Sequence, residues 1–219
     1  MNATKENNKN QQLSIASMNC RGLNGSQKRN DVLHYLRKKK YSIYCLQDVH
    51  FEKEMETNVQ AEWGFDCYFS SYKSNSRGVA IFVNNTFEYK VHNVKHDDNG
   101  NLLALDIEIH EYRITLVNIY GPNNDTPVFY DELEQIVDDF NNPHTIICGD
   151  WNLILNEKLD CLNYTRINNP NARERVLQLS NKLNLIDPWR CQNPDKRLYT
   201  WRDHESEKTI KIRLFFYFI

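Results

Sequence analysis

Short apolar runs recur along most of the chain, and they predict a protein rich in β-strands. Each run contains β-branched or aromatic residues and is bounded by turn formers, which is the usual signal of a strand. Strands are predicted at residues 13–18, 41–46, 65–69, 78–83, 87–94, 102–109, 112–120, 145–148, 199–202 and 210–219. Asp97-Asp98-Asn99-Gly100 is typical of a tight turn that joins two antiparallel strands.

Helical spacing of apolar residues is found in three longer segments, 27–39, 127–140 and 172–183. Ser26 and Thr126 are predicted to cap the first two helices, with Pro127 at the first helical position. A short helix is expected within 51–63, an irregular segment at 156–171 and a turn at 187–189. Strands in close succession, with helices between groups of them, predict an α/β (α+β) fold of two packed, mostly antiparallel sheets flanked by helices.

The length of 219 residues suits one domain, expected at 13–219 behind a polar, disordered leader at 1–12. No apolar run approaches the roughly 20 residues that span a bilayer, and the leader lacks the apolar region of a signal peptide. The six cysteines include no Cys-x-x-Cys pair. Reduced thiols in an intracellular protein, nuclear or cytoplasmic and without a membrane partner, are therefore expected.

The net charge of −2 provides no overall attraction to nucleic acid, so any such binding has to come from a local basic surface. The run Arg37-Lys38-Lys39-Lys40 has two interpretations. It suits the C-terminal end of a helix, where cations interact favourably with the helix dipole, and it also suits a nucleic-acid patch.

The most informative stretch is Ile146-Ile147-Cys148-Gly149-Asp150-Trp151-Asn152, a buried strand that runs into a carboxylate and an amide. An extended backbone would place Asp150 and Asn152 on one side and Trp151 on the other, in the core. Such a strand end can form an active site in an α/β protein. It can equally be a plain Asx turn, because Asp and Asn favour that position.

Polar residues also follow several other apolar strands. The set comprises Asn19, Asp48, Tyr120, Asp150, Asn152 and Thr200. If these strands end at one edge, their carboxylates, amides and phenol would provide oxygen ligands of the kind that suits Mg²⁺ or Mn²⁺. A hard cation among such groups fits phosphodiester hydrolysis. Taken singly, Asn19 is also a turn former, Asp48 a cap, and Tyr120 and Thr200 ordinary strand residues.

Six short motifs occur in order along the chain. They are Met18-Asn19-Cys20-Arg21-Gly22-Leu23, Leu46-Gln47-Asp48-Val49-His50, Arg77-Gly78-Val79-Ala80-Ile81, Asn118-Ile119-Tyr120-Gly121-Pro122-Asn123, Gly149-Asp150-Trp151-Asn152 and Leu185-Ile186-Asp187-Pro188-Trp189-Arg190. This succession resembles the endonuclease/exonuclease/phosphatase superfamily. Within it, the chain is most similar to the apurinic-like endonuclease domain of LINE-type (non-LTR) retrotransposons.

The resemblance implies a DNase I-like four-layer sandwich and an enzyme that uses Mg²⁺ to nick target DNA, leaving a 3′ hydroxyl that primes reverse transcription. It implies no further small-molecule cofactor. By position, Asn19 and Asp48 would hold the metal and Tyr120 would contact the scissile phosphate. Asp150 would orient or deprotonate the attacking water, and Asn152 would help to hold the phosphate or the transition state.

Thr200 matches a threonine at the DNA-facing rim of the family, and Arg21 is also expected to bind substrate. A phosphoinositide or sphingomyelin substrate is a further alternative within the superfamily. The retrotransposon-like motifs at 20–23 and 188–190 argue against that alternative.

Two positions depart from the family pattern. Asp48 stands where the family has Glu, and a misplacement of about an ångström can cost roughly 10²-fold in rate. Phe215 stands where the family has the Asp that orients a catalytic histidine. The Ser-Asp-His segment that supplies this histidine is not found in the 219 residues, and His204 beside Asp203 is the nearest candidate by composition.

These departures predict an impaired endonuclease from a truncated or decayed reading frame that lacks its last strand. The apolar run at 215–219 is then expected to leave an aggregation-prone edge. The alternative is a non-catalytic remnant that keeps the fold and at most binds nucleic acid.

Overall fold

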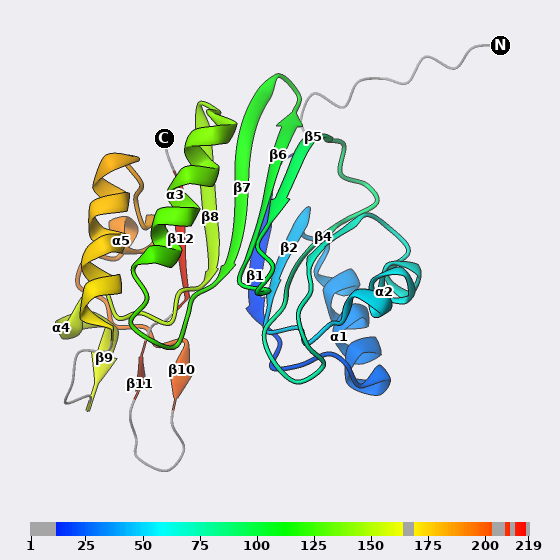
Figure 1. Ribbon diagram of the computed structural model, residues 1–219, viewed down its shortest axis with the longest axis horizontal. Coiled ribbons are helices and arrows are strands. Elements are labelled where there is room, and N and C mark those ends of the chain that lie inside the picture. The colour runs from blue at the N-terminus through cyan, green and yellow to red at the C-terminus, as the bar shows by residue number, and fades with distance from the viewer. Residues whose placement is uncertain (1–11, 164–168, 203–208, 211–212, 218–219) are drawn as a thin grey trace.

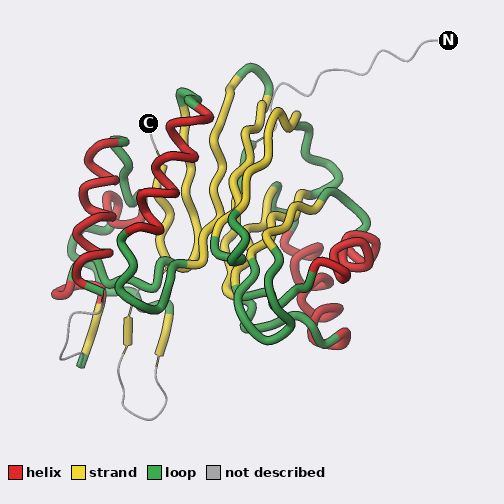
Figure 2. The backbone as a smooth tube through the Cα atoms, in the orientation of Figure 1, coloured by secondary structure: helices red, strands yellow, loops and turns green. Residues whose placement is uncertain are grey.

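Two β-sheets pack face to face, and helices cover the outer face of each, which makes four layers (Figure 1). The computed structural model describes residues 12–163, 169–202, 209–210 and 213–217. Figure 2 shows the same arrangement, with strands in the middle and helices on both sides. The predicted fold class is confirmed.

The first sheet has four strands in the order β1 (Ile15–Asn19), β2 (Ile43–Gln47), β4 (Val79–Val83) and β3 (Cys67–Ser70). The second has five, in the order β12 (Arg213–Tyr217), β8 (His144–Asp150), β7 (Tyr112–Tyr120), β6 (Leu102–Ile109) and β5 (Lys90–His96). A small third sheet joins β10 (Trp201–Arg202), β11 (Thr209–Ile210) and β9 (Cys161–Leu162).

Each large sheet is antiparallel except for one pair of strands. β1 runs parallel to β2, with Asn19 opposite Gln47. β7 runs parallel to β8, with Tyr120 opposite Asp150. Parallel neighbours end at the same edge of a sheet, so these two pairs bring the polar residues that follow them together.

Helices α1 (Ser26–Lys39) and α2 (Glu56–Trp63), the latter preceded by a 3₁₀ turn at Lys53–Met55, cover the first sheet. Helices α3 (Val128–Phe140) and α5 (Pro170–Lys182) cover the second. The apolar layer between the sheets includes Cys45, Ile81, Leu105, Leu116 and Cys148, all almost fully buried. Among the described residues, no helix has the length and apolar character to cross a bilayer.

The predicted helix caps are wrong. α1 begins at Ser26 with Gly25 in the cap position, and α3 begins at Val128 with Pro127 there, and neither cap residue makes a side-chain bond. The Thr126 hydroxyl instead donates to the carbonyl of Asn124, at 3.2 Å. A threonine hydroxyl can hydrogen-bond a backbone group of its own loop instead of a backbone N–H group of the helix, and Thr126 does so here.

Residues 156–163 are not irregular, contrary to the prediction. The Asn156 side chain accepts from the backbone nitrogens of Lys158 and Leu159 and starts the short helix α4 (Glu157–Asp160), which leads into β9. The turn predicted at 187–189 is the start of α6 (Pro188–Gln192), capped by Asp187. Capping bonds of this kind stabilise single helical turns that show no apolar periodicity.

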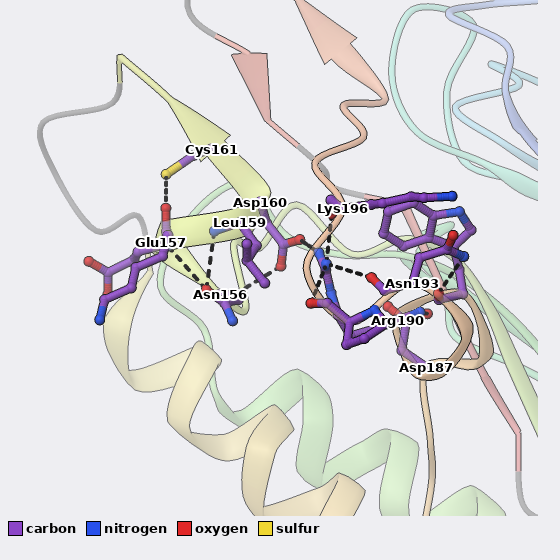
Figure 3. A network of polar contacts seen from close by, with 12 residues as sticks. Asn156, Glu157, Leu159, Asp160, Cys161, Asp187, Arg190, Asn193 and Lys196 are labelled. Carbon is purple, nitrogen blue, oxygen red and sulfur yellow. Dashed lines mark hydrogen bonds and ion pairs between the residues drawn. The ribbon is translucent and has the colours of Figure 1, made fainter.

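A polar network centred on Arg190 joins these short elements (Figure 3). The guanidinium of Arg190 contacts the buried Asp160 carboxylate, and it also donates to three backbone carbonyls, those of Asn193, Pro194 and Lys196. Asp160 also accepts from the backbone nitrogen of Asn156, at 3.0 Å. The network therefore ties the segment that leads to β10 to the segment that follows β8.

Candidate active site

Four of the predicted site residues meet at one end of the sandwich. Asn19, Tyr120 and Asp150 are the last residues of β1, β7 and β8, and Asp48 directly follows β2. The Asn19 side chain donates from Nδ2 to Oδ2 of Asp150, at 2.9 Å, and so joins the two sheets. Strand ends of both sheets therefore form the predicted shared edge.

Asp150 is 1% exposed and lies at the centre of this group. Its Oδ1 accepts from the backbone nitrogen of Asn152 at 3.3 Å, which is the Asx turn that the sequence also allowed. The Asx-turn interpretation of the strand end is thus confirmed, and the turn holds Asn152 next to Asp150, while the active-site interpretation stays a prediction. Trp151 is fully buried, as predicted, and its ring stacks on that of Tyr130.

The extended backbone predicted between Asp150 and Asn152 is wrong. β8 ends at Asp150, and Asn152 has a φ of 51°, in the left-handed region that Asn tolerates better than most residues. The Asn152 side chain donates to the carbonyl of Gly121 at 2.6 Å. Gly121 is restricted to glycine, because a Cβ there would lie 2.3 Å from the carbonyl oxygen of Trp151.

The carboxylates of Asp48 and Asp150 both affect the pKa of the Tyr120 phenol. Burial and, next, the charges of Asp48 and Asp150 raise the pKa of its phenol to about 12, against hydrogen bonds from Asn152 and Asn123 that lower it. The phenol is therefore protonated at neutral pH and is able to donate a hydrogen bond. The phenol of Tyr120 therefore lies within the electrostatic influence of Asp48 and Asp150 and within hydrogen-bond reach of Asn152.

Asp48 contacts a histidine that the sequence analysis did not select. Oδ1 of Asp48 lies 2.9 Å from Nε2 of His50, and both side chains are largely buried. A Ser-Asp-His context does not mark His50 in the sequence, and its signal is its position two residues after a strand-end carboxylate. His204, the nearest candidate by composition, lies outside the described residues.

An open groove of about 790 Å³ runs past Asp48, His50 and Tyr120. Its other polar lining residues are Asn75, Ser76, Arg77, Asp97, Asn99, Asn101, Asn123, Asn124, Thr126 and Glu132. The guanidinium of Arg77 stacks on the ring of Tyr72, 5.1 Å from its centroid. Most of these asparagines lie in loops. Asn is common in turns for structural reasons, so its presence there does not by itself predict a binding role.

Of the two predicted substrate contacts, Arg21 and Thr200, Arg21 contacts this group. Arg21 is exposed, and its backbone nitrogen donates to Oδ1 of Asn19 at 3.0 Å, which places it beside the site. Thr200 is exposed and directly precedes β10, and it is not among the groove-lining residues of the described chain. Strands β10 and β11, which follow Thr200, lie with β9 at the same end of the sandwich as the site (Figure 1).

Phe215 belongs to β12, whose backbone pairs with β8 in antiparallel register. Phe215 lies opposite Cys148, and Arg213 lies opposite Asp150. Position 215 is therefore two residues along β12 from Arg213, the residue that pairs with Asp150.

The donor set suits a hard divalent cation. The described residues contain no cluster of three or more His, Cys, Asp or Glu side chains that could hold a metal. Mg²⁺ is instead commonly held by one or two carboxylates together with water. The carboxylate of Asp48 and the amide of Asn19 provide oxygen ligands of this kind, beside the buried carboxylate of Asp150.

A profile of the endonuclease/exonuclease/phosphatase family matches residues 16–204, which includes β1, β2, β7 and β8 with their polar ends. The chain belongs to this family. The match confirms the family resemblance that the motifs indicated.

The chain is 28% identical over 206 residues to the "Transposon TX1 uncharacterized 149 kDa protein" of Xenopus laevis. This match covers 90% of the chain but only 15% of that protein. Among solved structures, the AP endonuclease of Leishmania major has a TM-score of 0.75 at 16% identity, with 94% of this chain and 78% of that chain covered. A 3′ phosphatase from Neisseria, bound to a product DNA hairpin, has a TM-score of 0.73 at 18% identity, with 94% and 86% covered. At these identities, the two structures support the fold alone.

Proposed function

We propose that the chain is a divalent-cation-dependent DNA endonuclease that nicks target DNA for a non-LTR retrotransposon. The observation that carries the proposal is the contact of Asn19 with the buried Asp150 carboxylate, next to a protonated Tyr120 phenol that lines the groove. This arrangement combines a base, a hydrogen-bond donor and oxygen ligands, which are the groups that phosphodiester hydrolysis needs.

The relatives support the substrate and the biological setting. The Xenopus protein is a transposon protein by name, and the Neisseria enzyme is described with product DNA. Because the chain spans 15% of the length of the Xenopus protein, priming of reverse transcription is proposed for a larger protein of which this chain is the nuclease part.

In this proposal, the groove receives the DNA strand and Tyr120 donates a hydrogen bond to an oxygen of the scissile phosphate. Asp150 accepts a proton from the attacking water, and Asn19 keeps the Asp150 carboxylate turned toward the other sheet. Asn152 is bound to Gly121 and hydrogen-bonds the phenol, so it holds Tyr120 in place. Asp48 and Asn19 would hold Mg²⁺ or Mn²⁺, which when bound would neutralise the charge that develops on the phosphate.

The test is nicking of supercoiled plasmid by purified monomeric protein, with Mg²⁺, with Mn²⁺ and with EDTA. The proposal predicts open-circular product only with a divalent cation, and nicks that a DNA polymerase extends, because the product end is a 3′ hydroxyl. Nicking in EDTA would contradict the role of the cation, and nicks that cannot be extended would contradict the role in priming.

A second candidate is DNA binding without hydrolysis, and Phe215 is the residue that favours it. A phenylalanine has no group to orient a catalytic histidine, and in this family an aspartate is expected at that position. In this case a folded protein would retain DNA in a filter-binding assay while plasmid stays supercoiled with either cation.

A further inference from the structure

His50 has no assigned role, although it contacts a carboxylate that the proposed function needs. We propose that His50 is a positioning residue that fixes one oxygen of Asp48 so that the other can bind the divalent cation. The inference rests on the proposed metal role of Asp48. It concerns the geometry of the carboxylate and not the ionisation of the histidine.

The contact is specific in its atoms. Nε2 of His50 lies 2.9 Å from Oδ1 of Asp48, and the two side chains are 20% and 17% exposed. Among the described residues, Oδ2 of Asp48 has no hydrogen-bond or ion-pair partner, and Asp48 lines the groove. A carboxylate is planar, so a bond to one oxygen sets the direction of the other.

The backbone around the pair is held in an uncommon conformation. Asp48 has a φ of 54° and His50 a φ of 60°, both in the left-handed region that costs energy for residues other than glycine. Two backbone bonds hold this turn, from the nitrogen of Gly22 to the oxygen of Asp48 at 2.7 Å and from the nitrogen of His50 to the oxygen of Arg77 at 2.8 Å. A strained backbone conformation of this kind persists only where contacts with the surrounding structure hold it in place.

The imidazole ring is confined on its other side by Gly22. A Cβ at position 22 would lie 2.7 Å from Nδ1 of His50, and Gly22 itself has a φ of 80°. The ring is thus held between a glycine of one loop and a carboxylate of the next. This confinement suits a residue that orients its neighbour, as partners of metal ligands commonly do.

The test is a mutant cycle read by Mn²⁺ binding, measured as free Mn²⁺ in electron paramagnetic resonance. The variants are His50→Ala, Asp48→Ala and the double variant, with His50→Gln to restore a donor near Nε2. His34→Ala, an exposed histidine on α1, is the matched control. Circular dichroism confirms that each variant is folded, and the nicking rate is a second measurement.

We expect His50→Ala to weaken Mn²⁺ binding about 10-fold, as loss of such a partner commonly does. His50→Gln should recover most of the affinity, and His34→Ala should leave it unchanged. In the Asp48→Ala background, His50→Ala should change the affinity less than twofold, because the histidine acts through Asp48.

Equal losses with and without Asp48 would overturn the inference, as would full affinity in His50→Ala. If the native chain binds no Mn²⁺, or if Asp48→Ala does not weaken binding, the metal role of Asp48 fails and this inference fails with it. Binding that depends on Asp48 but not on His50 would leave the proposed function intact.

Discussion

Asn19 and Asp150 are 131 residues apart in sequence, and a 2.9 Å hydrogen bond from Nδ2 to Oδ2 joins them across the two sheets. Gln47 pairs with Asn19 in the first sheet, and its Nε2 donates to Oδ1 of Asn118 at 2.7 Å, also between the sheets. The apolar layer is therefore bounded, at the site, by polar contacts that fix one sheet against the other. Sheet packing and site geometry depend on the same residues.

Asn118→Leu should lower the free energy of unfolding by about 3 kcal/mol, because buried groups left without partners cost about 1–3 kcal/mol each. Asn118 is fully buried and bonds the carbonyls of Leu46 and Ala80 as well as Gln47. Urea unfolding at neutral pH measures the change, and the exposed Gln27→Leu is the control. A loss below about 0.5 kcal/mol would show that this network does not hold the sheets.

Tyr120→Phe should reduce the nicking rate about 10²-fold, since it removes one donor aimed at the developing charge and keeps the ring. The thermal midpoint should change little, because the aromatic ring stays in place. Nicking at saturating Mg²⁺ measures the effect. A rate within twofold of the native protein would exclude the phenol from the reaction.

Glu134 of α3 contacts Lys182 and Arg175 of α5, and these bonds hold its pKa below the ordinary range. A lowered carboxyl pKa stabilises the fold above the unfolded-state value of about 4.3, and this stability is lost as pH falls through the folded-state pKa. Glu134→Gln should therefore cost about 1 kcal/mol at pH 7 and progressively less on acidification below the unfolded-state pKa. Urea unfolding at several pH values tests the trend, and a cost that rises on acidification would contradict it.

Arg190→Ala should destabilise the chain by roughly 3 kcal/mol, because the buried Asp160 would lose its ion-pair partner. Arg190→Lys should recover only part of this, because an ammonium cannot reproduce a guanidinium bonded to a carboxylate and three carbonyls at once. Limited proteolysis within 193–200 should become faster in both variants. Unchanged cleavage there would show that the network in Figure 3 does not hold this segment.

The long elements were predictable because their signal is local. β6 and β7 occupy the residues predicted for them, since long apolar runs bounded by clear turns leave little freedom. α4 and β9 were not predicted, because a helix of a single turn depends on one Asn156 cap and a two-residue strand depends on a partner distant in sequence.

In the candidate site, too, some features could be predicted from the sequence and others could not. The rule that polar residues follow buried strands indicated Asn19, Tyr120 and Asp150, and each lies at a strand end. The contact of Asn19 with Asp150, the left-handed backbone of Asn152 and the approach of His50 to Asp48 depend on the packing of separate elements. No periodicity in the sequence encodes them, so they had to come from the structure.

The most direct test of the account is the single-turnover nicking rate of Asp150→Asn in Mg²⁺, compared with that of the native chain. Asn keeps the size of Asp150 and its ability to accept a hydrogen bond but removes the charge, and the exposed Asp31→Asn on α1 is the matched control. We expect a loss of about 10³-fold for Asp150→Asn in a folded protein, within the range for removal of a general base, and no loss for the control. A rate for Asp150→Asn equal to that of the native protein would contradict the assignment of this site as the nuclease centre.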